Sequence, residues 1–301
     1  MIKSHQAALR VSRRLIACLL AYLLTSTAIP VAAEQPKELL IGIEPEHNIF
    51  DQMEQYRFLA SYLSDKLGVK VNLTIMSRYG EVLKRFKSLK LDGAFLTAYT
   101  ATMGIKELNL EPIANRVNLT GESTSQGIIF VRKDSGIREA KDMQGKSIVF
   151  VDPANMEGYL FPLAYLKQHG ITGINTFFYR FFYSGSHAST IFTVLDGRAD
   201  IGAAKNTTFN RLVQNDPSIQ KELYIIAQSP KVPEITLCLS NGIDLNLRER
   251  LATVLLNMDK NAPGKEVLEK FKARQFIKPD KGDFAKIEEM AREAQEALTG
   301  H

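Results

Sequence analysis

Short apolar segments alternate with amphipathic segments from residue 38 onward, and this alternation constrains the fold more than any other feature of the chain. Residues 38–43 are a short apolar run, a Glu-Pro pair follows, and residues 51–67 have apolar side chains at helical spacing. Short apolar runs are typical of buried strands, and a period near 3.6 is typical of amphipathic helices. Strands that alternate with helices indicate an α/β domain with a largely parallel sheet. We therefore expect an α/β fold.

The same order of elements occurs twice along the chain. Its first occurrence continues with strands at residues 69–75 and 91–96 and a helix at residues 79–90. Its second occurrence has a strand at residues 147–151, a helix at residues 157–169, and strands at residues 176–183 and 199–204. Such a weak internal repeat favours two lobes of similar build.

Two extended segments, residues 127–131 and 233–237, are the candidate crossovers between the lobes. The predicted division is a leader at residues 1–33, lobe 1 at 34–125, lobe 2 at 126–233, and the second part of lobe 1 with the C-terminal helices at 234–301. Two strands that join two lobes form a hinge, with a cleft between the lobes. The amphipathic segment at residues 284–298 is expected to pack on lobe 1, with packing on a partner as the alternative.

The first 33 residues have the pattern of an export signal. Arg10, Arg13 and Arg14 precede a mostly apolar stretch that ends in Val31-Ala32-Ala33, a small-residue cleavage site. We expect a periplasmic protein with a cleaved leader; retention of the leader as an anchor is the alternative. The leader has bases and no acids, so it accounts for most of the formal net charge of +5. The remaining chain has no basic tract that would predict nucleic-acid binding.

The sequence lacks the common motifs of catalysis and cofactor binding. It has no Gly-x-Ser-x-Gly elbow, no phosphate-binding Gly-x-x-x-x-Gly-Lys loop and no dinucleotide fingerprint. The five histidines show no ligand spacing with one another or with cysteine, and Cys238 is alone once the leader is removed. We expect no enzyme, no cofactor and no metal; the enzymatic alternative would use Glu157 and His187 as an acid-base pair.

Polar residues follow the predicted strands, and ligands of open α/β sheets bind at the carboxyl ends of strands. Helix-start amides there can receive an anion, although the same side chains can simply cap helices. His187 could donate a hydrogen bond or a charge, and Lys205 could supply charge, although lysines are usually solvated. The candidate ligand-binding residues are Tyr79, Thr97, Tyr99, Asn155, Met156, Glu157, Ser184, Ser186, His187, Asn206 and Thr207.

Residues 38–275 resemble the periplasmic phosphate, phosphite and phosphonate solute-binding proteins of ABC transporters, which have a type II periplasmic-binding fold. The resemblance rests on residues 40–43, 66–71, 79, 92–97, 131–135, 152–153, 158–162, 185–187 and 199–201. It implies that an oxyanion is held by hydroxyls and amides at the start of the helix after Asp152-Pro153, by Tyr79, by His187, and by an acid or polar group after residues 199–204. It also implies a non-catalytic, monomeric protein whose partner is an inner-membrane permease.

Two positions depart from the pattern of this family. A run of hydroxyl residues before Gly158 is replaced by Asn155-Met156-Glu157, and Glu157 would repel an anion unless it turns away or stays protonated. Where phosphonate binders have an acid for a ligand amine or hydroxyl, this chain offers Asn206 or Thr207. We therefore expect an ABC-transporter solute-binding protein for a small ligand, with a phosphorus oxyanion as the candidate. A sensory receptor that docks on a transmembrane kinase or chemoreceptor is the alternative.

Overall fold

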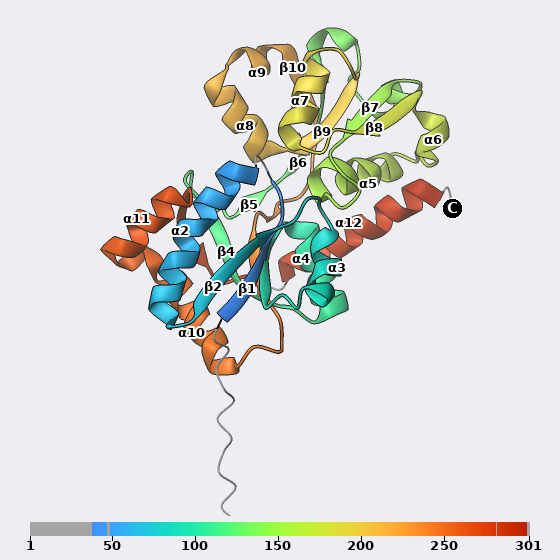
Figure 1. The fold of residues 1–301 in the computed structure, drawn as a ribbon. Helices are drawn as coiled ribbons and strands as arrows, with labels where there is room; N and C mark the ends of the chain where they lie inside the picture. Colours follow the sequence, from blue (N-terminus) through green and yellow to red (C-terminus); the bar gives the residue numbers. More distant parts are fainter. Residues whose placement is uncertain (1–37, 47–48, 281, 300–301) are drawn as a thin grey trace, which may run out of the picture. The chain divides into compact units, whose positions relative to one another are not determined.

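Two mixed β-sheets with helices on both faces organise the chain in this computed structural model (Figure 1). The structure describes residues 38–46, 49–280 and 282–299, which lie in one unit spanning residues 36–301. The predicted leader at residues 1–33 lies outside the described residues. Among the described helices, none has the length and apolar character required to cross a membrane.

The first sheet has the strand order β13-β4-β12-β3-β1-β2 and belongs to lobe 1. Its strands are β1 (Glu38–Ile43), β2 (Lys70–Ile75), β3 (Gly93–Leu96), β4 (Glu111–Asn118), β12 (Thr236–Leu239) and β13 (Ala273–Ile277). Side chains alternate between the two faces of a strand, so Leu39, Ile41 and Ile43 all point to one hydrophobic core. That core lies under α2 (Ile49–Leu67), α10 (Leu245–Leu256) and α11 (Ala262–Lys270). The opposite face packs against α3 (Glu81–Ser88) and α4 (Ala98–Leu108).

The second sheet has the strand order β10-β6-β9-β7-β8 and belongs to lobe 2. Its strands are β6 (Gly127–Arg132), β7 (Ser147–Phe150), β8 (Arg180–Tyr183), β9 (Ile201–Lys205) and β10 (Leu223–Gln228). One face packs against a π-helical turn, η3 (Met156–Leu160), and against α5 (Phe161–Gln168). The other face packs against α7 (His187–Leu195), α8 (Asn206–Asn215) and α9 (Ser218–Glu222). The remaining short helices are α6 (Ile174–Phe177), η1 (Lys133–Ser135), η2 (Ala140–Met143) and η4 (Met258–Lys260).

A two-stranded ladder of β5 (Thr124–Ser125) and β11 (Val232–Pro233) lies where the chain passes between the sheets. The expected crossovers at residues 127–131 and 233–237 are instead largely strands β6 and β12 inside the two sheets, so the connection lies a few residues earlier along the chain. The two-lobed α/β fold is confirmed, but the sheets are mixed. β6, through which the chain enters lobe 2, runs antiparallel to β9 and β10, and β12, through which it returns to lobe 1, runs antiparallel to β3. Part of the strand expected at residues 176–183 is also helical, in α6.

The C-terminal helix α12 (Gly282–Thr299) contacts both lobes, as Figure 1 shows in red. Phe284, Ile287, Met290 and Ala294 are buried in the core that also contains residues of α4 and α5. Their spacing places them on one helical stripe, as the amphipathic pattern indicates. At the edges of this stripe, Lys106 of α4 pairs with Glu288 at 3.4 Å and Lys167 of α5 pairs with Glu296 at 3.4 Å. The helix thus contacts α4 of lobe 1, where its packing was expected, and it makes its more extensive contact with α5 of lobe 2.

Candidate functional site

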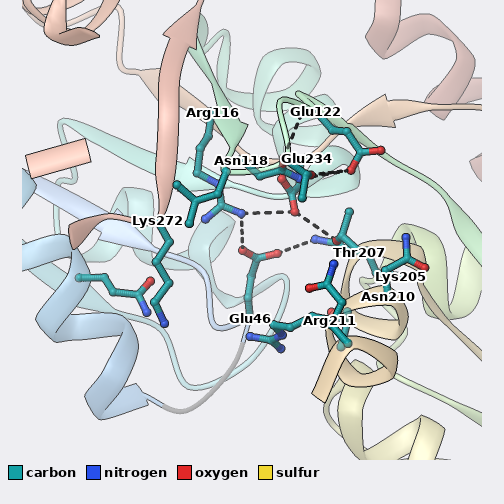
Figure 2. A pocket seen from close by; sticks show the side chains of 15 residues that line it. Glu46, Arg116, Asn118, Glu122, Lys205, Thr207, Asn210, Arg211, Glu234 and Lys272 are labelled. Carbon is teal, nitrogen blue, oxygen red and sulfur yellow. Dashed lines mark hydrogen bonds and ion pairs between the residues drawn. The ribbon is translucent and has the colours of Figure 1, made fainter. Parts of the chain in front are cut away.

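A cavity of about 520 Å³ receives charged side chains from both lobes (Figure 2). Glu46 follows β1 and Arg116 lies in β4, so both belong to lobe 1; Lys205 ends β9 of lobe 2. Glu234 follows β11 of the connecting ladder. Glu46, Lys205 and Glu234 thus lie at or just beyond the carboxyl ends of strands, where open α/β sheets bind ligands, whereas Arg116 lies within β4.

Ion pairs join the four charged residues into one chain. Lys205 Nζ lies 2.5 Å from Glu46 Oε1, and Arg116 Nη2 lies 3.8 Å from Glu46 Oε2 and 3.4 Å from Glu234 Oε1. Thr207 of α8 also donates its hydroxyl to Glu234 Oε1 at 3.2 Å. The Lys205–Glu46 pair connects lobe 2 to lobe 1 at the edge of the cavity, as Figure 2 shows.

The Glu44–Glu46 segment is fixed by the start of α2. The Gln52 amide donates to the carbonyl of Glu44 at 2.8 Å and accepts from the backbone N–H of Glu46 at 3.1 Å. The carboxylate of Glu44 turns the other way, accepting from the Thr97 N–H at 2.8 Å and the Thr100 hydroxyl at 2.5 Å. Burial raises the pKa of Glu44, and these hydrogen bonds partly oppose the rise. Glu44 therefore holds the loops of lobe 1 together, while Glu46 faces the cavity.

Lys205 is a buried lysine, with only 2 % of its surface exposed. Burial by itself lowers the pKa of a lysine, but the carboxylates of Glu46, Glu157 and Glu234 outweigh it, and the net pKa of Lys205 is raised. Arg116 has the same balance: burial opposes its charge, and Glu234 and Glu46 raise its pKa. Both bases are therefore fully charged, and acids already compensate them.

Glu157 does not turn toward solvent. It is fully buried in η3, accepts a hydrogen bond from Ser125 Oγ at 2.8 Å, and lies 3.9 Å from Lys205 Nζ. Asn155 Oδ1 accepts from the Gly158 N–H at 2.6 Å, so this helix-start amide is occupied by a side chain of the protein. A Cβ on Gly158 would come within 2.3 Å of a Val151 methyl carbon, which explains the glycine at this close contact.

His187 begins α7 but is buried rather than solvent-facing. Its Nδ1 accepts from the Lys205 N–H at 3.0 Å, which assigns the proton of the neutral ring to Nε2. Asn155 Nδ2, 3.3 Å from Nε2, also carries hydrogens, so that contact is not a hydrogen bond in this tautomer. Burial, with a smaller effect of the Lys205 charge, lowers the pKa of His187 from 6.5 to about 3. His187 is therefore neutral near pH 7 and brings no positive charge to a ligand.

Tyr79 is buried, and its hydroxyl has no hydrogen-bond partner among the described residues. Burial raises its pKa most, and the charges of Glu46, Glu44, Glu157 and Asp152 raise it further. The next residue, Gly80, lies so close to Ala154 of lobe 2 that an added Cβ would approach the Ala154 Cβ to 2.9 Å. The loops of both lobes thus meet at Tyr79, in a region of negative potential.

The other predicted site residues have structural partners. Thr97 and Asn206 bond to neighbouring loops, Ser184 and Ser186 bond within the start of α7, and Met156 lies in the hydrophobic core. Tyr99 packs against the same core from α4. Of the predicted set, only Thr207 lines the cavity. The roles of the set as ligand contacts stay a prediction.

Seven charged residues of the cavity were not among the predicted ligand-binding residues, although Lys205 had been considered as a source of charge: Glu46, Arg116, Glu122, Lys205, Arg211, Glu234 and Lys272. Glu46 and Lys205 each follow or end a strand, so the rule about carboxyl ends could have selected them. Arg116 could not have been selected by this rule, because it lies within β4 rather than at its carboxyl end. Glu234 follows the short β11, which sequence periodicity cannot detect.

The fold and the shared cavity define a class: two α/β lobes on a two-stranded connection, the type II periplasmic-binding fold. Such proteins bind solutes and are not enzymes. Residues 41–284 match the family described as "ABC transporter, phosphonate, periplasmic substrate-binding protein", and the chain belongs to this family.

Named relatives agree with this assignment. The phosphonates-binding periplasmic protein of Escherichia coli K12 is 24% identical over 79% of this chain and 71% of its own length. The probable ABC transporter phosphite binding protein PhnD1 of Prochlorococcus marinus is 25% identical over 85% of this chain and 90% of its own. The solved structure of that PhnD1 with methylphosphonate has a TM-score of 0.75 at 22% identity, covering 87% of this chain and 99% of the other.

Proposed function

We propose that the mature chain captures one small solute in the cavity between its lobes and delivers it to an ABC permease in the inner membrane. The observation that carries this proposal is the Lys205–Glu46 ion pair, which connects the two lobes at the edge of the cavity. A volume of about 520 Å³ is within the usual range of small-molecule sites.

Export and assembly follow the sequence expectations. We propose that residues 1–33 are removed as a signal peptide, that the mature protein is a monomer, and that the lobe boundaries fall at the β5–β11 ladder. That ladder, at Thr124–Ser125 and Val232–Pro233, supports the boundaries expected at 125/126 and 233/234. Import is the proposed role rather than sensing, because the family is defined by ABC transport.

Closure of the lobes would assemble the site. Lys205 comes from lobe 2 and Glu46 from lobe 1, so their ion pair forms only when the lobes approach. Thr207 of lobe 2 and Arg116 of lobe 1 likewise meet at Glu234 of the connection. A solute that contacts both groups would shift the population toward the closed form, the form that a permease can recognise.

The test is thermal unfolding of residues 34–301 against solutes of each charge class: phosphate, phosphite, methylphosphonate, carboxylates, amino acids, amines and sugars. A solute that binds only the folded state raises the midpoint, and lobe closure lowers the radius of gyration in small-angle scattering. Thr207→Val is expected to weaken the response, whereas Thr176→Val, which removes a hydroxyl bonded to the Gly173 carbonyl of α6, should leave it unchanged. If no solute of any class raises the midpoint, the proposed capture of a solute is wrong.

A further inference from the structure

A carboxylate of the protein lies between two buried bases of the cavity. Glu46 Oε1 is 2.5 Å from Lys205 Nζ of lobe 2, and Glu46 Oε2 is 3.8 Å from Arg116 Nη2 of lobe 1. The Lys205 side chain is 2 % exposed and the Arg116 side chain 11 %. Figure 2 shows the Glu46 carboxylate with one oxygen toward each base. Two oxygens of a phosphonate or phosphate group suit the same pair of bases.

Each base also has a second carboxylate. Glu157 lies 3.9 Å from Lys205 Nζ, and Glu234 Oε1 lies 3.4 Å from Arg116 Nη2. If Glu46 leaves, each base therefore keeps one acid beside it. An oxyanion with one negative charge would then replace the Glu46 carboxylate charge for charge, so neither buried base would lose its compensation.

Two residues that line the cavity have buried polar atoms without a hydrogen-bond partner among the described residues. These atoms are the donor Nε of Arg116 and the acceptor Oε2 of Glu234. Glu46, at 3.8 Å, is beyond hydrogen-bond distance of Arg116 and pairs with it by charge alone. Because buried polar atoms are nearly always hydrogen-bonded, the pair indicates a partner that both accepts and donates. A singly protonated phosphonate does both, through its charged oxygens and its hydroxyl.

Exposed bases of the same cavity favour the arrival of an anion. Arg211 of α8 lines it from lobe 2, and Lys272, which precedes β13, lines it from lobe 1. Glu122 is an exposed acid of the lining, and its carboxylate accepts from the Thr120 hydroxyl at 3.1 Å. Salt screens exposed charges, so these bases act on the rate of encounter more than on the bound state.

The helix start that the family resemblance assigns to an oxyanion supplies no base. Asn155 Oδ1 accepts from the Gly158 N–H, and His187 is neutral. The buried positive charge beside the cavity comes instead from Arg116 and Lys205.

From these observations we infer that an oxyanion of the solute binds between Arg116 and Lys205 and displaces the Glu46 carboxylate from them. This inference rests on the proposed solute-binding function and specifies which residues hold the charge of the solute. Without solute, Glu46 links the lobes through Lys205. The bound oxyanion takes over this link. Part of the binding free energy is spent on displacing Glu46, so this residue sets how tightly an anion must bind in order to replace it.

The test compares the parent with Glu46→Gln, both as residues 34–301, by calorimetric titration with methylphosphonate and with phosphate. The ion pairs of Glu46 exist only without solute, so their loss destabilises only the solute-free form. Glu46→Gln should therefore bind methylphosphonate about tenfold more tightly, while its unfolding midpoint without solute falls by several degrees. Dimethyl methylphosphonate, the uncharged ester, should bind to neither protein. Glu266→Gln is the control, because it removes an exposed carboxylate that pairs with Lys270 of α11, and it should bind as the parent does.

The outcomes separate the inference from the proposed function. A Glu46 pair that persists on binding would lower the midpoint without tightening the binding, so equal or weaker affinity of Glu46→Gln would overturn the displacement. Glu46→Ala, a second variant without the charge, should show the same two changes. Binding of the uncharged ester as tight as that of methylphosphonate would overturn the oxyanion site. If neither methylphosphonate nor phosphate binds to either protein, the inference is wrong, and the wider panel above decides separately whether the protein captures a solute of another class.

Discussion

The buried position of the His187 ring lets us predict how the free energy of unfolding depends on pH. The ring is buried, its Nδ1 accepts from the Lys205 N–H, and protonation of Nδ1 would set two N–H groups against each other. Lys205 lies beside it as a second positive charge. Protonation of His187 is therefore strongly disfavoured in the folded state and free in the unfolded state.

The size of the effect follows from proton linkage. Because the folded-state pKa of about 3 lies below the unfolded value of 6.5, the contribution is present above pH 6.5 and is lost as pH falls toward 3. Between pH 8 and pH 5 the unfolded histidine takes up nearly one proton and the folded one almost none. The loss is about 2 kcal/mol, since each pH unit below 6.5 costs about 1.4 kcal/mol. This figure hardly changes if the folded pKa lies one unit higher.

The assay is urea unfolding of residues 34–301 at pH 8 and pH 5, for the parent chain and for His187→Gln. The parent should lose about 2 kcal/mol more than the variant over this interval. Glu44 and the other acids titrate in both proteins and cancel in the comparison. His169→Gln, at an exposed histidine after α5, is the control and should behave as the parent. Equal pH dependence of the parent and His187→Gln would refute the assignment of a buried neutral ring.

Four further results are expected. Glu44→Ala leaves the buried Thr97 N–H without its acceptor and removes the carboxylate that the Thr97 and Thr100 hydroxyls share, and it should cost about 3 kcal/mol in urea unfolding; a loss below 1 kcal/mol would contradict its structural role. Glu157→Ser removes one carboxylate beside Lys205 and should strengthen the calorimetric signal with methylphosphonate; equal signals from both proteins would count against a repulsive effect of Glu157 on an anion. Cys238 is fully buried with a raised thiol pKa and should react with a thiol reagent only after unfolding, so fast labelling of the native protein would be the contrary result. Removal of residues 282–301 exposes an apolar stripe and should lower the midpoint by several degrees, and an unchanged midpoint would show that α12 contributes little.

Periodicity predicted the lobes well because it reports burial directly. The strand expected at residues 38–43 is β1 to the residue, and the helix expected at 51–67 differs from α2 by two residues at its start. It failed at residues 176–177, a Thr-Phe pair of high strand propensity that lies in a short helix rather than in a strand. The direction of β6 and β12 was also beyond it, since strand direction depends on the path of the chain between lobes.

The site was harder to predict because its chemistry depends on distance rather than on sequence spacing. Glu46 and Lys205 are 159 positions apart in the chain and meet at 2.5 Å. Lysines are usually solvated, so sequence alone favoured an exposed Lys205, whereas three carboxylates make its burial tolerable. His187 was expected as a source of charge, and only its surroundings show that it is neutral. The departure at Asn155-Met156-Glu157, by contrast, was visible in the sequence and is the feature that most changes the chemistry of the site.

The helix α12 affects the balance between the open and closed forms of the protein before a solute binds. A hinge of two strands alone would let the empty protein spend most of its time open. Here the stripe from Phe284 to Ala294 contacts both lobes, so each opening must separate apolar surface from α4 or α5. We therefore expect the empty closed form to be more populated than a hinge alone would allow, so that less of the binding free energy of the solute is spent on closing the lobes. A transporter served by such a protein must then distinguish loaded from empty molecules by more than closure of the lobes.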